Sequence, residues 1–485
     1  MGIVASQSLK NVISTYSGFL IGAINTLFLY TQFLSGEYYG MVGVMLSAAH
    51  VMMPIMAFGV HNTLVKFYSS FKTRVSINSF LTLMILLPLA VIIPVSFLGY
   101  VGYRSIGTFL STKNALIKDY VWHIIVIAIA LAYFEVFFAW AKVQMKTVFG
   151  NFMKEVFHRV VAMLLLFLLY FDFLNVEQFM LGLVYMYLLR MLIMKIYAFS
   201  LKLPVISFKK LSNLSSILKY SSLILLAGSV ASILLDVDKV MLGKLIVNLD
   251  NVAYYNVAVY IATVIVVPQR AMHQILMPLS AKYLNERDFG ALGELYKKSS
   301  LNLFVVSGFI FLIIVSNISQ FYTLIDEQYS AGIYVVILIS LAKLYDSVLG
   351  SNNAILFNSD YYRVILTFGV ILVVLMIVLN IVLIPVLGIN GAALGTFAAI
   401  VLYNSVKLFF VYRYFKVLPF TFNSLKTAVL ILVSALIFYF WDFPFHAIIS
   451  IALKSILICV SYFVVVYKFN LSEDISASLD KYLKK

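Results

Sequence analysis

The chain has 485 residues, of which 63% are apolar and only 11% are charged, and its formal net charge is +15 at pH 7. Soluble domains carry about a quarter charged residues, so this composition excludes a soluble globular protein and indicates a polytopic membrane protein. The basic residues stand in short segments beside apolar runs, a pattern that reflects membrane topology and argues against nucleic-acid binding. The single cysteine, Cys459, excludes an internal disulfide and a thiolate metal site.

Apolar runs of about 20 residues, long enough to cross a hydrocarbon core of roughly 30 Å, recur along the whole chain. The first run lacks a small-residue cleavage site, which predicts a retained span and not a removed signal peptide. We expect an all-α polytopic fold of about fourteen transmembrane helices, with a count of twelve as the alternative. The expected helices begin near residues 12, 39, 78, 117, 156, 178, 216, 251, 299, 331, 362, 390, 423 and 446.

The distribution of lysine and arginine predicts how these spans are oriented. With the N-terminus inside, cytoplasmic segments hold 25 of the 35 basic residues and outer loops hold five. Short loops rich in positive residues are retained on the cytoplasmic side, so both termini are expected in the cytoplasm.

An internal repeat divides the spans into two sets. The segment SGEYYG at 35–40 resembles NVAYYN at 251–256 at an offset of 216 residues, and Lys66 and Lys282 keep that offset. The offset equals six predicted spans, so the two sets would share one orientation. We therefore expect two six-helix lobes and two further helices with a cytoplasmic tail, in residues 1–200, 201–415 and 416–485.

Charged residues inside apolar spans are costly, by about 2.5–3.5 kcal/mol on insertion scales, so they mark cavities or partnered sites. Arg190 lies near the middle of the sixth span, and Glu135 lies in the fourth span at a depth within reach of Arg190 or Lys195. A buried ion pair that locks the N-terminal lobe and a cavity-lining role are both compatible with this placement.

The tenth span carries a second pair of charges. Lys343 and Asp346 stand at i and i+3, where they either neutralise each other or offer a cation to an anionic ligand. In the second case Arg190 and Lys343 would supply one cation from each lobe. Arg270 ends the eighth span on the cytoplasmic side, where an interfacial, topology-setting role is favoured over a cavity role.

A third group of charges interrupts the seventh span near its outer end. Asp236, Asp238 and Lys239 fall within four residues, and the acid-first spacing of Asp236 and Lys239 favours an ion pair along one helix face. We expect this segment to anchor the helix at the outer interface and to gate the outward opening, with direct substrate contact as the alternative. His50, central in the second span, is either a neutral packed histidine or a proton relay.

Three short segments, taken in order, carry a family resemblance. They are EYYG at 37–40, DKVMLGK at 238–244 followed by AYYNVA at 253–258, and IPVLGINGAALG at 384–395. In the third, Pro385 and Gly388 permit a turn between spans, and small residues let the next helix approach a neighbour closely. With these segments the chain resembles the Wzx-type polysaccharide flippases of the MATE-like MOP superfamily.

The resemblance implies a function and its partners. It implies a bacterial inner-membrane flippase that moves an undecaprenyl-diphosphate-linked oligosaccharide, such as an O-antigen repeat unit of lipopolysaccharide, to the outer leaflet by alternating access. The implied partners are this lipid-linked substrate and the bilayer, with a polysaccharide polymerase and a chain-length regulator as further candidates. No cofactor is implied, and coupling to H⁺ or Na⁺ stays open.

Two other functions predict different residue patterns. A MATE-like, cation-coupled multidrug exporter predicts acidic residues in its cavity, whereas the mid-span charges here lean basic. A membrane-embedded transferase or a scaffold for polysaccharide synthesis predicts a carboxylate-rich outer loop, but the longest outer stretch, residues 102–119, holds one acid. The sequence has no Walker loop, HExxH motif or paired carboxylates, so we expect a transporter and not an enzyme.

Overall fold

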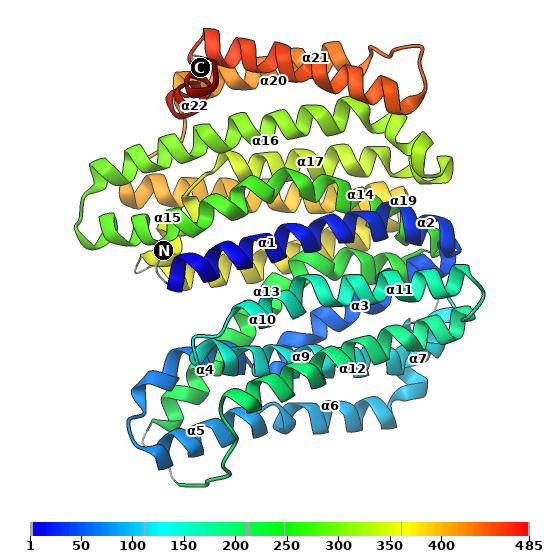
Figure 1. The fold of residues 1–485 in the computed structure, drawn as a ribbon, viewed down its shortest axis with the longest axis vertical. Helices are drawn as coiled ribbons and strands as arrows, with labels where there is room; N and C mark the ends of the chain where they lie inside the picture. The colour runs from blue at the N-terminus through cyan, green and yellow to red at the C-terminus, as the bar shows by residue number, and fades with distance from the viewer. Residues whose placement is uncertain are drawn as a thin grey trace. The chain divides into compact units, whose positions relative to one another are not determined.

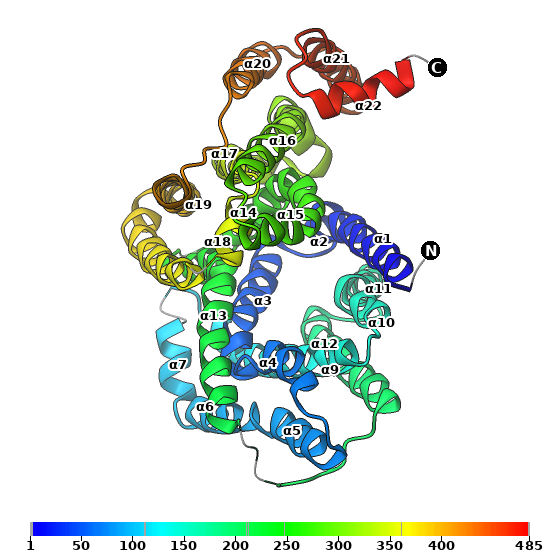
Figure 2. The ribbon, with the colours of Figure 1, turned by 90° about the vertical axis from the view of Figure 1, so that its left-hand side faces the viewer.

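The computed structural model describes residues 3–110, 113–209, 211, 213–246, 248–359 and 361–483, and every regular element among them is a helix (Figures 1 and 2). The helices form two compact units, residues 1–256 and 257–485, which divide within helix α14. The first unit contains α1 (Ile3–Ile24), η1 (Asn25–Leu29), α2 (Tyr30–Phe33), α3 (Gly36–Ala57), α4 (Val60–Phe67), η2 (Tyr68–Ser70), α5 (Arg74–Leu86), α6 (Leu89–Val101), α7 (Tyr103–Leu110), α8 (Leu116–Asp119), α9 (Val121–Val143), α10 (Val148–Phe152), η3 (Met153–Phe157), α11 (His158–Tyr170), α12 (Val176–Leu201) and α13 (Leu214–Leu245). After α14 (Asp250–Thr263), the second unit contains η4 (Val264–Val266), α15 (Val267–Asn285), α16 (Phe289–Ile325), η5 (Glu327–Gly332), α17 (Ile333–Val348), α18 (Asn352–Asn358), α19 (Tyr362–Phe415), α20 (Phe422–Tyr439), α21 (Ala447–Lys468) and α22 (Glu473–Leu483).

The length and apolarity of these helices confirm an all-helical, multi-pass membrane protein. Among the described residues, eleven helices are long and apolar enough to cross a membrane, and α13 adds a twelfth if its two bent halves form one span. The halves, Leu214–Val230 and Ser232–Leu245, meet at an angle of 48°. The structure therefore supports eleven or twelve spans, and the finer count of fourteen stays a prediction.

Two places account for the difference between twelve and fourteen. The expected eleventh and twelfth spans both lie in α19, whose 54 residues are interrupted only at Gly388. A straight helix of that length would measure roughly 80 Å, far more than a bilayer core. The expected fifth span lies in the run 148–170, where the five-residue π-helix η3 separates α10 from α11.

The core of the first unit lies where α9 meets α4, α5 and α12. Its largest buried side chains include Phe80, Phe134 and Trp140, and the Trp140 indole N–H donates to the Lys202 carbonyl at 3.2 Å. Helix α9 also packs on α3, and α3 packs on α13. Consequently α12, which carries Arg190, packs on α9, and α13, which carries Asp236, packs on α3.

The expected lobe boundary at residue 200 and the observed unit boundary at residue 256 differ. The reason is α13, the expected first helix of the second lobe, which packs against α3 of the first unit. Compactness and repeat symmetry are different criteria, so the assignment of two six-helix lobes stays a prediction.

The core of the second unit is built by α16, α20 and α21, which Figure 2 shows beside one another. Tyr462 of α21 is 1% exposed and donates to the Val305 carbonyl at 2.9 Å. Lys454, which is also 1% exposed, donates to the Ser316 carbonyl at 2.8 Å and pairs with Asp442 at 2.5 Å. These bonds fix α21 to α16.

Gly388 has a backbone conformation that favours glycine, with φ 59° and ψ −133°. An added Cβ would meet no described atom within 4 Å, so the effect of a substitution is conformational and not steric. We expect Gly388→Ala to lower the free energy of unfolding by about 1–3 kcal/mol, measured as a lower apparent Tm in detergent.

The matched control for this variant is Gly290→Ala, where an added Cβ makes only an ordinary 3.4 Å contact with Asp288. It should leave Tm unchanged or raise it, because alanine is the better helix former. Equal Tm values for the two variants would contradict the strain assigned to Gly388.

Candidate functional site

Arg190 is a buried cation in the middle of α12, a helix that begins with a capping box between Asn175 and Gln178. Its side chain is 5% exposed, and its guanidinium carbon lies 4.2 Å from the ring centre of Phe134 and 5.0 Å from that of Tyr187. One Nη lies 3.5 Å from Nδ1 of His158. Among the described residues, no carboxylate lies within 4.0 Å of this guanidinium, and its Nε is buried without a hydrogen-bond partner.

Three carboxylates of the same unit are paired with other cations. The pairs are Glu135 with Lys154 at 2.6 Å, Glu155 with Arg159 at 3.3 Å and Asp236 with Lys239 at 3.2 Å. The ion pair expected between Glu135 and Arg190 or Lys195 is therefore replaced by one with Lys154, because η3 turns Lys154 toward α9. Each of the three acids is neutralised by one cation, and Arg190 remains as an additional positive charge.

Asp236 joins α13 to α3. It accepts from the Ser47 hydroxyl at 2.8 Å, and Nδ1 of His50 lies 3.9 Å from its other carboxylate oxygen. Lys239 approaches the first oxygen at i+3, as its spacing in the sequence predicts. Asp238, two residues further along α13, accepts from the Tyr255 hydroxyl at 2.7 Å. The charges of this segment thus tie α13 to its neighbours.

His50 and Lys154 present the accessible atoms of this polar region, with 41% and 42% of their side-chain surfaces exposed. His50 also lies within electrostatic range of Asp236, Arg190 and Lys154. The polar residues from α3, α9, η3, α11, α12 and α13 therefore form one neighbourhood, which we call the N-unit polar cluster. It consists of His50, Glu135, Lys154, Glu155, His158, Arg159, Tyr187, Arg190, Asp236 and Lys239.

The second unit holds the other predicted charges. Asp346 accepts from Nε2 of Gln269 and from Nδ2 of Asn404, both at 3.1 Å. Lys343 is half-buried on the same helix, and Arg270 is exposed near the start of α15. The structure thus brings Glu135, Arg190, Asp236, Lys239 and His50 into one cluster and holds Lys343, Asp346 and Arg270 in the other unit.

Several residues of these sites escape sequence analysis. Lys154 resembles a topology-setting loop charge, and His158 and Tyr187 resemble ordinary residues of apolar spans. Lys407 resembles a snorkelling lysine, but it is 2% exposed and donates to Oδ1 of Asn353 at 2.8 Å. The i and i+4 spacing of Glu155 and Arg159 is the one local signal that this segment carries partnered charge.

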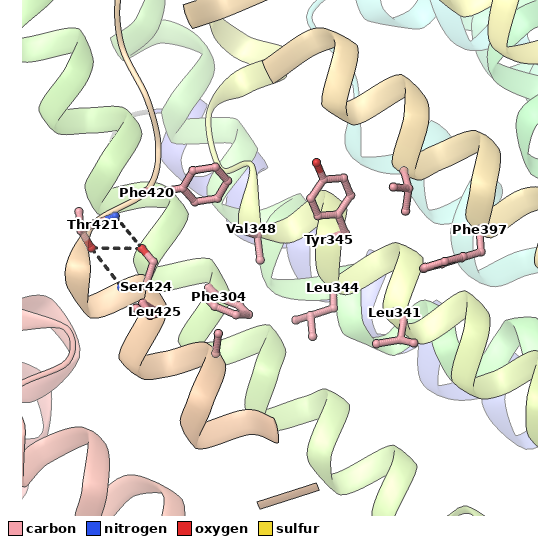
Figure 3. Close-up of a pocket in the computed structure, with 12 residues that line it drawn as sticks. Phe304, Leu341, Leu344, Tyr345, Val348, Phe397, Phe420, Thr421, Ser424 and Leu425 are labelled. Carbon is pink, nitrogen blue, oxygen red and sulfur yellow. Dashed lines mark hydrogen bonds between the residues drawn. The ribbon is translucent and has the colours of Figure 1, made fainter. Parts of the chain in front are cut away.

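An apolar pocket of about 610 Å³ lies within the second unit, between α16, α17, α19 and α20 (Figure 3). The aromatic rings of Phe304, Phe397 and Phe420 border it, and Tyr345 points its hydroxyl away from the apolar floor. At one end Thr421 and Ser424 form the capping box that starts α20. The full lining is Phe304, Leu341, Leu344, Tyr345, Val348, Phe397, Val401, Phe420, Thr421, Ser424, Leu425 and Ala428.

The Glu135 and Lys154 pair should contribute to the stability of the first unit. We expect Glu135→Gln to lower the free energy of unfolding by about 1–3 kcal/mol, because the variant removes the carboxylate that pairs with the Lys154 ammonium. The loss is limited because the Lys154 side chain is partly in contact with solvent. The measurement is thermal unfolding in detergent. Glu37→Gln, at an exposed position of α3, is the control and should leave Tm within error. An unchanged Tm in Glu135→Gln would show that the pair contributes nothing.

No protein-family model and no curated protein matches the chain. Solved structures do match its fold. A lipid II flippase, MurJ, in an inward closed conformation, superposes with a TM-score of 0.72 at 14% identity, covering 95% of this chain and 99% of that one. An inward-facing multidrug resistance MATE transporter of the MOP superfamily matches with a TM-score of 0.63 at 12% identity, covering 82% and 94%.

A third match is the MATE multidrug transporter DinF-BH, with a TM-score of 0.54, 15% identity and coverage of 84% and 95%. At these identities the likeness shows the fold alone: the chain has the fold of the matched MurJ and MATE structures. The matched structures are those of transporters and a flippase, not of enzymes. The predicted resemblance is thereby confirmed as a likeness in fold, whereas membership of the Wzx type stays a prediction.

Proposed function

We propose that this protein is a flippase that moves an undecaprenyl-diphosphate-linked oligosaccharide, the repeat unit of an O-antigen or another surface polysaccharide, to the outer leaflet of the bacterial inner membrane. The observation that carries the proposal is the buried positive charge of Arg190, which forms no salt bridge with any described carboxylate, while the nearest acids, Glu135 and Glu155, are each paired with another cation. The MurJ-like fold supports a lipid-linked substrate, because the matched protein is named as a lipid II flippase.

The balance of charges favours an anionic substrate over a cationic one. Removing the partner of a buried charge typically costs several kcal/mol, whereas a cation–π contact returns only about 0.5–2 kcal/mol. The rings of Phe134 and Tyr187 therefore compensate Arg190 only in part. A diphosphate reaching the accessible side of Lys154 and His50 would supply the missing negative charge, with charge-assisted hydrogen bonds.

The apolar pocket of the second unit supports the proposal that the substrate carries a lipid tail. Its wall is made mostly of aliphatic and aromatic side chains. Thr421 and Ser424 are polar and lie at one end, and the Tyr345 hydroxyl points away from the apolar floor. These walls are compatible with a segment of a polyprenyl chain, because aliphatic and aromatic side chains offer it the same apolar contacts as the acyl chains of the bilayer. The headgroup would cross the membrane inside the protein while the chain follows the apolar surface of α20 and its neighbours.

The topology that goes with this proposal has fourteen spans. The run 148–170 would be the fifth, and the two halves of α19 on either side of Gly388 would be the eleventh and twelfth. Two six-helix lobes would then rock against each other, with both termini in the cytoplasm. The contacts of Asp236, Asp238 and Lys239 between α13, α3 and α14 would serve as the outer gate.

The leaflet in which lipid-linked intermediates accumulate tests this function. In a deletion strain, we expect undecaprenyl-diphosphate-linked repeat units to accumulate on the cytoplasmic leaflet, and the wild-type gene to restore their export and surface polysaccharide. The measurement is protection of the oligosaccharide from an externally added glycosidase in spheroplasts. Normal access of the glycosidase in the deletion strain would contradict a flippase.

A MATE-like export of organic cations is the second candidate, favoured by the fold shared with two multidrug transporters. It requires unneutralised carboxylates, and in the N-unit polar cluster Glu135, Glu155 and Asp236 are each paired with a cation. The acid that such an exporter would use is therefore Asp346 of the second unit, which accepts from two amides. Uptake of a dye cation into inverted vesicles, driven by an imposed proton or sodium gradient, decides between the two. Gradient-driven dye transport without any effect on lipid-linked intermediates would favour the exporter.

A further inference from the structure

The connection between α12 and α13 exposes a run of apolar side chains. Residues 202–209, which we call the linking segment, form neither helix nor strand. Leu203, Ile206 and Phe208 of this segment are 74%, 75% and 79% exposed. Exposed apolar side chains that follow one another in this way mark a surface that a lipid or another protein covers. The neighbours of the linking segment identify which of these it is.

Side-chain hydroxyls of α5 hold the backbone of the linking segment. The Thr82 hydroxyl donates to the Val205 carbonyl at 3.3 Å and accepts from the Ser207 N–H at 3.1 Å. The Ser79 hydroxyl accepts from the Lys209 N–H at 3.2 Å and lies 2.7 Å from the Ser207 hydroxyl. Later residues of the segment thus meet earlier residues of α5, so the two run side by side in opposite directions (Figures 1 and 2).

The place of α5 in the membrane decides what covers the linking segment. Helices α5 and α6 form one candidate span, Arg74–Val101, and only 28% of its most apolar stretch is buried inside the protein. The two hydroxyls that hold the segment, at Ser79 and Thr82, lie about 8 and 12 Å from the start of this span. Backbone at that depth needs hydrogen-bond partners, which α5 supplies, and exposed apolar side chains there meet lipid. The covering partner is therefore the bilayer.

The same region carries cations without nearby acids. Lys72 and Arg74 are exposed at the start of α5, and Lys209 is exposed at the end of the linking segment. No carboxylate of the described residues lies within 4.0 Å of these three cations. The sequence explains their isolation, because residues 38–118 and 178–235, which contain α5 and the linking segment, include no Asp or Glu. Basic groups beside a membrane attract anionic lipid headgroups.

We propose that the linking segment and the start of α5 form a binding surface for an anionic phospholipid. The acyl chains of this lipid contact the exposed apolar side chains of the segment, and its phosphate binds the three cations. A zwitterionic lipid makes the first contact equally well, but its own cation opposes the second. In the topology proposed above, the surface faces the cytoplasmic leaflet. Lipid binding here is independent of the transported substrate and of the proposed function.

Lipid-dependent quenching of a single label tests the surface. Cys459 is the only cysteine, so Cys459→Ser combined with Phe208→Cys gives one fluorescent label at position 208 of the full-length protein. In proteoliposomes, we expect lipids with a nitroxide on the acyl chain to quench this label. Phosphatidylglycerol carrying the nitroxide should quench at a mole fraction lower by at least about twofold than phosphatidylcholine carrying it. A label introduced by Glu286→Cys, in an exposed turn of the second unit, should be quenched weakly by both lipids.

Removal of the cations separates lipid selectivity from insertion into the bilayer. In the triple variant Lys72→Gln, Arg74→Gln and Lys209→Gln, the label at position 208 should still be quenched by phosphatidylcholine, because the apolar contacts remain. The preference for phosphatidylglycerol should disappear, because the phosphate loses its partners. Retained quenching by phosphatidylcholine also shows that the variant is folded with the linking segment in place.

The matched control removes the same charge from the second unit by changing three exposed lysines to glutamine, Lys282, Lys297 and Lys298. It should keep the preference for phosphatidylglycerol at position 208. Quenching at position 208 as weak as at position 286 would show that the bilayer does not cover the linking segment. Equal quenching by the two lipids would overturn the anionic-lipid surface, as would a preference that survives in the triple variant. Failure of the leaflet assay would reject the flippase and leave these results unaffected.

Discussion

Arg190→Gln is expected to reduce delivery of lipid-linked oligosaccharide to the outer leaflet by about 10- to 100-fold, since a charge-assisted hydrogen bond contributes about 1.5–3 kcal/mol. The measurement is surface polysaccharide and glycosidase-accessible intermediate at equal protein level. Lys195→Gln, at an exposed position of the same helix, is the matched control and should retain activity. Full activity in Arg190→Gln would remove the main support for an anionic substrate.

The same variant, Arg190→Gln, should not be less stable than wild type, although its transport is reduced. A buried guanidinium without a carboxylate partner is costly, so its replacement by a neutral side chain should leave Tm equal or raise it. A transport defect in a protein of unchanged or higher Tm identifies a functional charge. A large decrease in Tm would instead assign Arg190 a structural role through Phe134, Tyr187 and His158.

Filling the apolar pocket is the second change for which we expect a large effect. The double variant Leu341→Trp and Leu425→Trp adds two indoles to the pocket lining, one from α17 and one from α20. We expect transport of a long-chain polyprenyl substrate to fall to background, because the chain loses its site. An analogue with a short prenyl chain should be transported at a rate closer to that of wild type.

The control for the pocket is Leu432→Trp, two turns further along α20 at a position that is 61% exposed and outside the lining. It adds the same bulk to the same helix and should leave transport unchanged. Equal transport of the long-chain substrate by the double variant and by wild type would show that the tail does not use this pocket. If the protein instead exports a cationic dye through the second unit, these substitutions should alter dye transport. Unchanged dye transport in all three cases would mean that the dye bypasses the second unit.

The segment IPVLGINGAALG at 384–395 shows which structural features can be predicted from the local sequence. Pro385, Gly388 and the small residues after them predict a turn and a close approach, and Gly388 does break α19. At Gly391 an added Cβ would stand 2.2 Å from the Leu383 carbonyl oxygen, so the small residue is required. Such features depend on backbone conformation and residue size, which are encoded locally.

The charged pairs show what cannot be predicted from the local sequence. Depth along an apolar span is readable from the sequence, so Glu135 and Arg190 can be placed at similar levels, but their partners cannot be identified. Which face of a helix meets which neighbour depends on rotation about its axis and on interruptions such as η3, which turns Lys154 toward Glu135. The same limit hides Lys407, whose buried position between α18 and α19 has no counterpart in its flanking sequence.

The sequence by itself determined that this is an all-helical, multi-pass membrane protein, where most of its spans lie and that it resembles MOP transporters, because hydropathy and short turn motifs act over one helix at a time. The tertiary structure alone decided that Arg190 has no carboxylate partner among the described residues, that Asp346 is held by two amides and that an apolar pocket opens between four helices. These properties arise from contacts between residues far apart in the chain, and the balance of charge at a site exists only once those contacts have formed.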